Sequence, residues 1–336
     1  MRIYRDILRS AWQTLWRTPW LWPLGLLAAL AGNGGEYGSL VSSLERIANQ
    51  GSFLEALRLS LVSNESSGYW ANLWATFAQP PLATSSPLLV LHAATLAVIW
   101  VDTVAQASVI HAAGKVDRDE PTDFPQATRA GARYFWPIFW LNVLARFATY
   151  LVLAVSILPF LISYLAQPNT GVAFNWLIII SFVIFIPVAL VISFILKYAS
   201  TSVVLEGEQW WRALERAISI FFRNWLVSLE MAALLFGINL LLGFAVFTVI
   251  PQTISLDIAL LAARGSLTAL LHILPSVAAL LIVGAGYGAY QYIAWTILYR
   301  RLTQGTVVPK LVRATAEVPA YLEKLMRGSG KRVAGR

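Results

Sequence analysis

Five polar side chains interrupt the long apolar stretches of this 336-residue sequence. Asp102 and Gln106 are one helical turn apart in one stretch, as are Asn142 and Arg146 in another, so each pair lies on one face of a helix. Glu230 lies in a third stretch. Polar groups in hydrocarbon are costly, and those that occur there usually serve a function. These five residues are our candidate intramembrane polar cluster, and their chemistry suits a polar pathway or a lipid-headgroup site.

A structural role is the alternative for two of these charges. Arg146 follows Trp140 by six residues and Glu230 follows Trp225 by five, so they have a similar depth where these tryptophans mark the membrane interface. At that depth they can form a structural ion pair or extend towards the headgroups. The sequence leaves both interpretations open.

Familiar catalytic and metal-binding patterns are missing from the sequence. Cysteine is absent, which excludes disulfides, thiolate ligands and a cysteine nucleophile. No Gly-x-Ser-x-Gly motif occurs, and no metal-ligand spacing connects the three histidines, which are His92, His111 and His272. The run from Gly284 to Gly288 has no strand before it, so it predicts close helix packing rather than a nucleotide loop. We therefore expect a non-enzymatic protein with no catalytic, cofactor or metal residues.

The composition defines the class of elements that carry these residues. Hydrophobic residues make up 58% of the chain and charged residues only 12%, whereas soluble domains carry roughly twice that charged fraction. Long apolar runs without strand-like alternation predict an all-α, polytopic helical membrane protein rather than a closed barrel. The net charge of +8 then indicates positive loops and anionic lipid headgroups as partners, and no nucleic acid.

About six transmembrane helices are predicted, together with amphipathic helices at the cytoplasmic face. The spans cover residues 19–31, 87–113, 136–165, 174–196, 225–250 and 267–299. Basic amphipathic segments precede three of the spans, at residues 2–17, 125–135 and 207–223. We interpret residues 1–302 as a single transmembrane domain that contains a polar segment at 32–85, and 303–336 as a basic cytoplasmic tail.

The distribution of Lys and Arg predicts the orientation. Twenty-one of these residues fall on the side of the termini and three on the opposite side, which are Arg46, Arg58 and Arg264. This asymmetry places both termini in the cytoplasm of a bacterial inner-membrane protein. Residues 29–31 also fit a signal-peptidase site, but the long tryptophan-rich leader at 2–17 favours retention of the first span as an anchor.

A repeated plan emerges from the order of these segments. Arg9, Arg129 and Arg216 each lie on a helix that precedes an aromatic cluster and a span. We interpret this pattern as three repeated hairpin units, which cover residues 1–114, 115–205 and 206–302. The alternative is that any basic segment before a span has this appearance.

Two longer motifs give the chain a family resemblance. These are the segment Val203-Val-Leu-Glu-Gly followed by Trp211-Arg-Ala-Leu-Glu-Arg-Ala and Phe222-Arg-Asn-Trp, and the segment Ala294-Trp-Thr-Ile-Leu-Tyr-Arg-Arg-Leu. With the opening WRTPWLWPLGLL, they resemble uncharacterised bacterial membrane proteins related to the glycerophosphodiester phosphodiesterase membrane domain. In that family a separate domain hydrolyses the diester. No segment outside the spans is large enough for such a domain, so the resemblance implies topology rather than activity.

The sequence therefore favours a membrane component that interacts with lipid or with a partner protein. The alternative is a transporter or channel for a small or lipidic solute that uses the intramembrane polar residues. Basic and aromatic side chains on the surface helices are the candidate interfacial lipid contacts, and they are Arg9, Arg17, Arg129, Arg216, Arg223 and Trp225.

Overall fold

The computed structural model describes residues 2–28, 86–166, 172–264 and 266–304, and it confirms the all-α class. The described residues contain helices and no strand. Four of their helices are long and apolar enough to cross a membrane, with candidate spans at Ala93–Val116, Phe135–Leu158, Val183–Glu206 and Trp225–Phe244. Large apolar side chains on these helices are largely exposed, including Phe147 at 64%, Val183 at 65% and Leu241 at 72%. Such surfaces suit lipid rather than water, so the chain is a helical membrane protein.

The long helices match the predicted spans at most of their ends. They are α6 (Ser86–Val116), α8 (Phe135–Ala166), α9 (Val172–Glu206), α11 (Trp225–Arg264) and α12 (Ser266–Thr303). Two boundaries were predicted wrongly. Helix α9 continues past residue 196 to Glu206, and α11 continues past residue 250 to Arg264, where a loop was expected. The added part of α11 contains several leucines and alanines, which have a high helix propensity.

The first predicted span is only partly described. Helix α2 covers Leu21–Leu27, and its seven residues rise only about 10 Å, against a hydrocarbon thickness of about 30 Å. The predicted signal-peptidase site at 29–31, the polar segment at 32–85 and nearly all of the tail at 303–336 lie outside the described residues. The total of six spans therefore remains a prediction.

Three short helices correspond to the predicted basic segments. They are α1 (Arg2–Arg17), α7 (Phe124–Arg133) and α10 (Trp210–Arg223). The Asp123 side chain caps α7 by accepting a hydrogen bond of 3.0 Å from the Gln126 backbone N–H. A single residue, Tyr134, separates α7 from α8, and Asn224 alone separates α10 from α11. Each of these two surface helices therefore leads directly into a long apolar helix.

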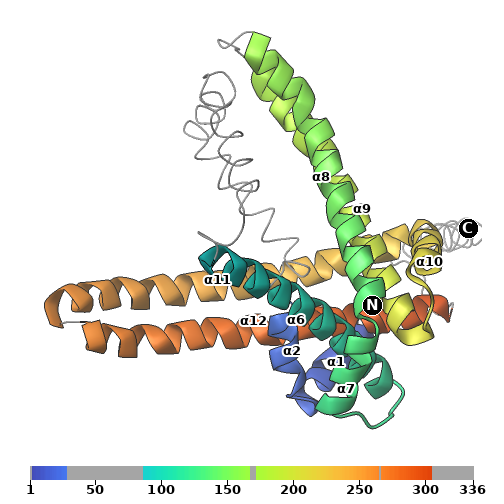
Figure 1. Cartoon of the computed structure of the whole chain (residues 1–336), viewed down its shortest axis with the longest axis horizontal. Coiled ribbons are helices and arrows are strands. Elements are labelled where there is room, and N and C mark those ends of the chain that lie inside the picture. Colours follow the sequence, from blue (N-terminus) through green and yellow to red (C-terminus); the bar gives the residue numbers. More distant parts are fainter. Residues whose placement is uncertain (1, 29–85, 167–171, 265, 305–336) are drawn as a thin grey trace, which may run out of the picture.

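The long helices diverge from a common region (Figure 1). Helices α8 and α9 run side by side in one direction, and α11 and α12 run side by side in another. Helix α6 contacts both α9 and α12, and α12 also contacts α9. The core lies where the C-terminal halves of these three helices meet, and α1, α2, α7 and α10 surround it.

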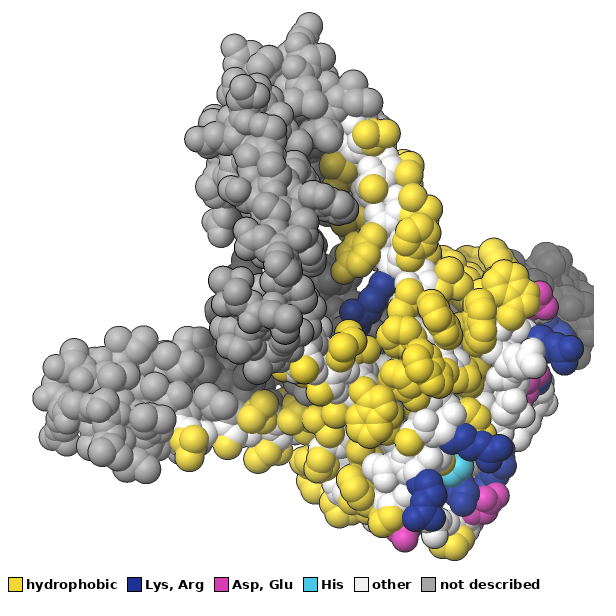
Figure 2. All heavy atoms as spheres, in the orientation of Figure 1, with side chains coloured by type: hydrophobic (Ala, Val, Ile, Leu, Met, Phe, Trp, Pro, Cys, Tyr) yellow, Lys and Arg dark blue, Asp and Glu magenta, His cyan; other side chains and the backbone are white. Residues whose placement is uncertain are grey.

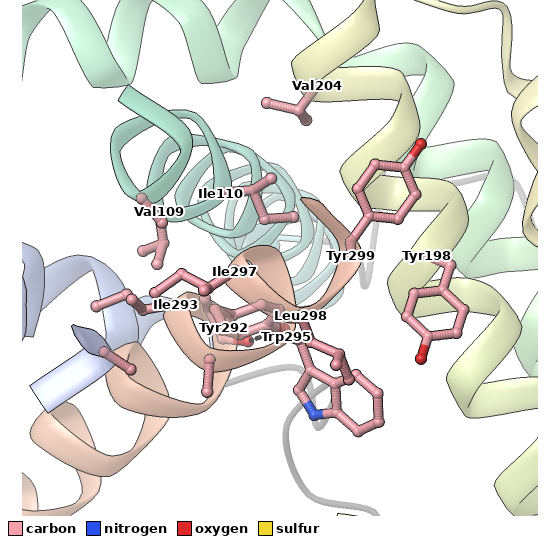
Figure 3. Packing of buried hydrophobic residues seen from close by; sticks show 14 of the residues in the cluster. Val109, Ile110, Tyr198, Val204, Tyr292, Ile293, Trp295, Ile297, Leu298 and Tyr299 are labelled. Carbon is pink, nitrogen blue, oxygen red and sulfur yellow. Dashed lines mark hydrogen bonds between the residues drawn. The ribbon is translucent and has the colours of Figure 1, made fainter. Parts of the chain in front are cut away.

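Aromatic and branched side chains fill this core (Figure 3). The rings of Tyr198 and Trp295 are 5.8 Å apart at an angle of 71°, an edge-to-face contact between α9 and α12. Each of the three core helices has buried hydroxyls that are hydrogen bonded within the helix, and examples are Ser108, Thr201 and Thr296. Each donates to the carbonyl four residues earlier, at 2.6, 2.8 and 2.8 Å respectively, so each is satisfied within its own helix.

Each surface helix packs on a different core helix. Helix α7 packs on α6, α10 packs on α9, and α1 packs on α12. Each surface helix buries at least one small residue, and these include Ala11, Gly131 and Ala217.

The sequence predicts close helix packing at the run from Gly284 to Gly288 of α12, and the closest approach occurs at neighbouring residues. No described atom lies within 4 Å of a Cβ built on Gly284, so that glycine faces open space instead of a neighbouring helix. The close approach occurs at Ala285 and Ala289, where Gly25 of α2 faces α12. A Cβ on Gly25 would lie 2.6 Å from both the Ala285 carbonyl oxygen and the Ala289 Cβ. Gly25, rather than Gly284, therefore brings two backbones together.

Candidate functional site

Two members of the predicted polar cluster are hydrogen bonded in the interior. Asn142 on α8 donates through Nδ2 to Oε1 of Gln106 on α6, at 3.0 Å. Gln106 in turn donates through Nε2 to the hydroxyl of Ser200 on α9, at 3.4 Å. All three side chains are buried. This chain of amides and hydroxyl connects three helices at one level.

Asp102 lies one helical turn before Gln106 and is 2% exposed. Arg146 on α8 is exposed, and Glu230 on α11 is half-buried. Because α8 packs mainly along α9 while α11 packs along α12, these two charges belong to different helix pairs. The predicted pairing of Arg146 with Glu230 stays a prediction.

Lys197 is a buried ionisable residue that the sequence analysis did not place in the cluster. The predicted span ended just before it, whereas α9 continues and leaves its side chain 7% exposed. Its ammonium nitrogen is 4.9 Å from the centroid of the Trp295 ring, which is a cation–π contact. The valines at 203 and 204 were the sequence signal for a longer helix, because they carry the apolar pattern beyond Lys197.

Asp102 and Lys197 lie at a similar level of the bundle. Helices α6 and α9 run parallel here. Gln106 of α6 contacts Ser200 of α9, and further along both helices Gly114 contacts Leu205. Asp102 precedes Gln106 by four residues and Lys197 precedes Ser200 by three. Both ionisable groups are thus about one turn from the same hydrogen bond, on the same side of it.

Buried polar atoms without a hydrogen-bond partner occur in the surrounding helices. Asn142 Oδ1, Gln291 Nε2 and Trp295 Nε1 have no hydrogen-bond partner among the described residues. A buried polar atom without a partner costs about 1–3 kcal/mol. The interior where α6, α8, α9 and α12 meet is therefore polar as well as closely packed.

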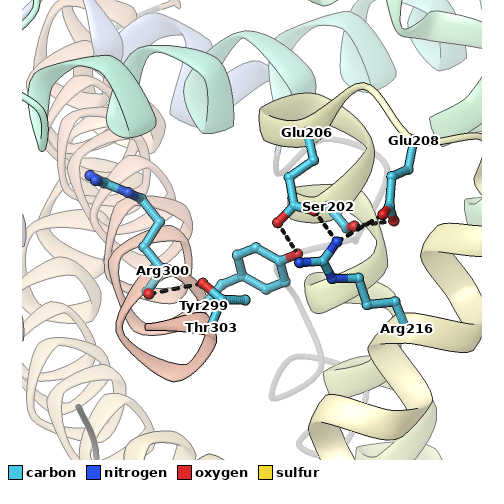
Figure 4. Close-up of polar contacts among 7 residues, drawn as sticks. All are labelled: Ser202, Glu206, Glu208, Arg216, Tyr299, Arg300 and Thr303. Carbon is cyan, nitrogen blue, oxygen red and sulfur yellow. Dashed lines mark hydrogen bonds and ion pairs between the residues drawn. The ribbon is translucent and has the colours of Figure 1, made fainter. Parts of the chain in front are cut away.

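A charged network lies at the C-terminal end of α9 (Figure 4). Arg216 of α10 forms ion pairs with Glu206 and with Glu208, the latter at 2.8 Å. Tyr299 of α12 donates to Glu206 Oε1 at 2.8 Å, and Ser202 donates to Glu208 Oε2 at 2.8 Å. Gly207 has a φ of +71°, and this left-handed conformation turns the chain between the two glutamates. The network holds α9, α10 and α12 together.

Arg216 was a predicted lipid contact, and in this network its guanidinium lies on two carboxylates. Its side chain remains 39% exposed, so solvent weakens these pairs. The link from this network to α12 could not be predicted from the sequence, because the residues that it joins are far apart along the chain. Glu206 and Tyr299, for example, are 93 residues apart.

A second ion pair joins the ends of α6 and α12. The Arg300 guanidinium donates to Asp117 Oδ2. Burial raises the pKa of the Asp117 carboxyl above its usual value, against the opposing effect of Arg300. This pair joins the C-terminal ends of α6 and α12, and the network around Glu206 joins the C-terminal end of α9 to α10 and α12.

Exposed tryptophans accompany the surface helices. Six tryptophans are each about half exposed or more, and they are Trp12 and Trp16 of α1, Trp136 and Trp140 of α8, Trp211 of α10 and Trp225 at the start of α11. Their rings are amphipathic and favour the interface between hydrocarbon and headgroups. Of the predicted lipid contacts, the structure also exposes Arg9, Arg17, Arg129, Arg223 and Trp225.

The space-filling view supports this assignment of an interface (Figure 2). The visible charged side chains gather mainly at one end of the molecule, and a continuous hydrophobic surface adjoins them. An exposed apolar surface with a charged rim is typical of a protein embedded in lipid.

These features define a helical membrane protein with a polar interior and an aromatic, basic interface. Among the described residues, no group of three His, Cys, Asp or Glu side chains is placed to hold a metal ion. Comparisons with protein-family models, with curated proteins and with solved structures find no match. The functional argument therefore depends on the geometry of this chain.

Proposed function

We propose that this chain is a non-enzymatic membrane component whose surface helices bind anionic lipid headgroups. The observation that carries the proposal is the division of two surface helices, α1 and α10, into a buried and an exposed apolar side. On α10, Ala213, Ala217 and Phe221 are buried against the protein, whereas Trp211 and Phe222 are 55% and 67% exposed. A helix that serves only to cover a core has no use for a second apolar strip beside its arginines.

The same division occurs on α1. Ile7, Ala11 and Leu15 are buried, and Trp12 and Trp16 are exposed. The Trp16 ring also packs edge-on against the Trp22 ring at 5.2 Å, and this contact holds the Trp16 side chain in its exposed position. Arg9 and Arg17 on the polar side of α1 supply the charge that attracts anionic lipid.

The proposal includes a location and an internal repeat. The distribution of Lys and Arg supports a bacterial inner-membrane protein with both termini in the cytoplasm. The contacts of α7 with α6, α10 with α9 and α1 with α12 support three units in a closed ring. If the chain is related to the glycerophosphodiester phosphodiesterase membrane domain, the two share this topology and not the hydrolytic activity.

Thermal unfolding in lipid nanodiscs tests lipid binding. We expect a higher Tm in phosphatidylglycerol than in phosphatidylcholine, because a ligand that binds only the folded state stabilises it. The triple variant Arg9→Gln, Arg17→Gln and Arg223→Gln should lose most of this difference. The double variant Arg118→Gln with Arg301→Gln is a control for the loss of positive charge elsewhere, since both residues are exposed and lie outside the surface helices. Equal Tm values in the two lipids would refute the proposal.

Transport is the second candidate function, and one observation favours it. Asp102 and Lys197 are both ionisable, both buried within apolar helices, and about one turn from the same hydrogen bond. Buried ionisable groups often line ion or solute pathways in membranes. Proteoliposomes loaded with a pH-sensitive dye provide the test. Proton flux that Asp102→Asn abolishes would favour transport, and no flux above empty liposomes would exclude proton movement.

A further inference from the structure

A groove of about 490 Å³ lies between α2, α6 and α7. Its size is within the range of about 300–1,000 Å³ that is usual for small-molecule sites. The lining is mostly apolar and includes Leu24, Leu27, Trp100, Val104, Phe124 and Ala132. Thr128 and Arg129, both from α7, supply its polar side chains. The groove thus combines apolar walls with one cationic group.

Backbone contacts keep the groove open. Gly131 holds α7 against α6, since a Cβ there would lie 2.5 Å from the Val104 carbonyl oxygen and would also overlap the Ser108 hydroxyl. Gly25 holds α2 against α12 in the same way. The closest backbone contact of α7 is therefore with α6 and that of α2 is with α12, and α2 also packs on α6. Where they begin, the rings of Trp20 and Phe124 meet edge-on at 6.2 Å and connect the two helices.

The lining favours an amphiphile with a negative head. Trp100 is 50% exposed and Phe124 is 45% exposed, so the apolar walls are accessible from outside the protein. Arg129 is exposed on α7, a helix that also carries Arg133. A guanidinium matches phosphate oxygens with two parallel hydrogen bonds, whereas an uncharged apolar ligand would leave it without this interaction.

We propose that this groove binds one acyl chain of an anionic phospholipid, with the phosphate at Arg129. The inference rests on the proposed function and identifies one discrete site for it. The acyl chain lies along Leu27, Trp100 and Val104 and covers the apolar surface of the groove. The headgroup stays at the level of α7, where the charged side of that helix meets the interface.

Native mass spectrometry of the full chain in detergent tests the charge requirement. Phosphatidylglycerol and phosphatidylcholine are supplied at equal concentration, and the retained lipid is counted. Wild type should retain phosphatidylglycerol preferentially, and Arg129→Gln should reduce its retention about tenfold, the effect of one strong charged contact. Arg133→Gln is the matched control, because it removes the same charge from an exposed position on the same helix but does not line the groove.

A second pair of variants tests the apolar part of the site. Ala132 is exposed and lines the groove, so Ala132→Trp fills the groove from α7 without entering the core, and it should also reduce retention. Gln126→Trp adds the same ring to α7 at an exposed position outside the groove, and retention should be unchanged. A photoreactive side chain at Thr128 should capture the lipid.

The outcomes separate this inference from the proposed function. Equal losses in Arg129→Gln and Arg133→Gln would overturn the site, because diffuse charge would then explain lipid retention. Unchanged retention in Ala132→Trp would overturn it as well, as would capture of a peptide from residues 29–85 by the group at Thr128. If wild type retains no phosphatidylglycerol, the proposed function itself fails.

Discussion

Replacement of Gly25 by alanine is the most direct test of how α2 is held. The new Cβ would lie 2.6 Å from the Ala285 carbonyl oxygen and 2.6 Å from the Ala289 Cβ. Ordinary contacts between such atoms are about 3.5–4.0 Å. The obstructing atoms belong to the backbone of α12 or are attached directly to it. A side-chain rotation therefore cannot relieve the overlap, and α2 must move away by about 1 Å.

The magnitude follows from two opposing effects. Overpacking of a well-packed site costs about 1–3 kcal/mol. Alanine regains about 1 kcal/mol of helix propensity over glycine. Because the overlap is with backbone, we expect the upper part of the overpacking range and a net loss of about 1–2 kcal/mol. At about 2–4 °C per kcal/mol, Gly25→Ala should lower the Tm by about 2–8 °C.

Gly284→Ala is the matched control. Gly284 lies in α12 near the same contact, and no described atom is within 4 Å of its added Cβ. The same chemical change should therefore leave the Tm unchanged or raise it slightly through helix propensity. Both variants are measured by thermal unfolding in one detergent. Equal shifts for the two glycines would refute the close approach of α2 to α12.

Three other predictions concern the interior, the ion pair and the interface. Gln106→Met leaves the Asn142 amide without its acceptor and should cost about 1–3 kcal/mol, and adding Asn142→Leu should recover much of this loss in a double-mutant cycle measured by unfolding. The folded-state pKa of Asp117 is raised above 3.8, so the stability from this group is full below the unfolded pKa and is lost as pH rises through the folded pKa. In Asp117→Asn, the Tm should fall less than in wild type as the pH rises through the acidic range. If the Tm of both proteins changes with pH in the same way, this prediction is wrong. The chain has no cysteine, so Trp211→Cys can carry a single nitroxide label. The label should be accessible both to oxygen and to a polar relaxant, as expected at headgroup depth. Accessibility to oxygen alone would place this part of α10 in the hydrocarbon instead.

The surface helices could be predicted from the sequence because their pattern is local. The apolar spacing between Tyr4 and Leu15 predicts a helix at residues 2–17, and α1 has these bounds. The arginines and aromatic residues near Trp225 likewise identify the junction where α10 gives way to α11. Periodicity of this kind needs no knowledge of distant neighbours.

The interior depends on contacts that periodicity does not contain. Lys197 ended the predicted span because a charge lowers local hydropathy, yet its burial is permitted by Trp295, nearly a hundred residues away. Gly284 has the spacing of a packing motif, but the rotation of α12 about its own axis decides that Ala285 and Ala289 face α2. Arg216 looked like a lipid contact because Glu206 and Glu208 were not known to turn towards it.

The one-residue junctions at Tyr134 and Asn224 have a mechanical consequence. One residue joins α7 to α8 and another joins α10 to α11, so little backbone separates each of these two helices from the long helix after it. Bilayers of different thickness change the tilt of spanning helices. A change in the tilt of α8 or α11 therefore displaces α7 or α10, and α7 forms one wall of the groove that contains Arg129. We therefore expect membrane thickness to influence the shape of that groove through the backbone at Tyr134.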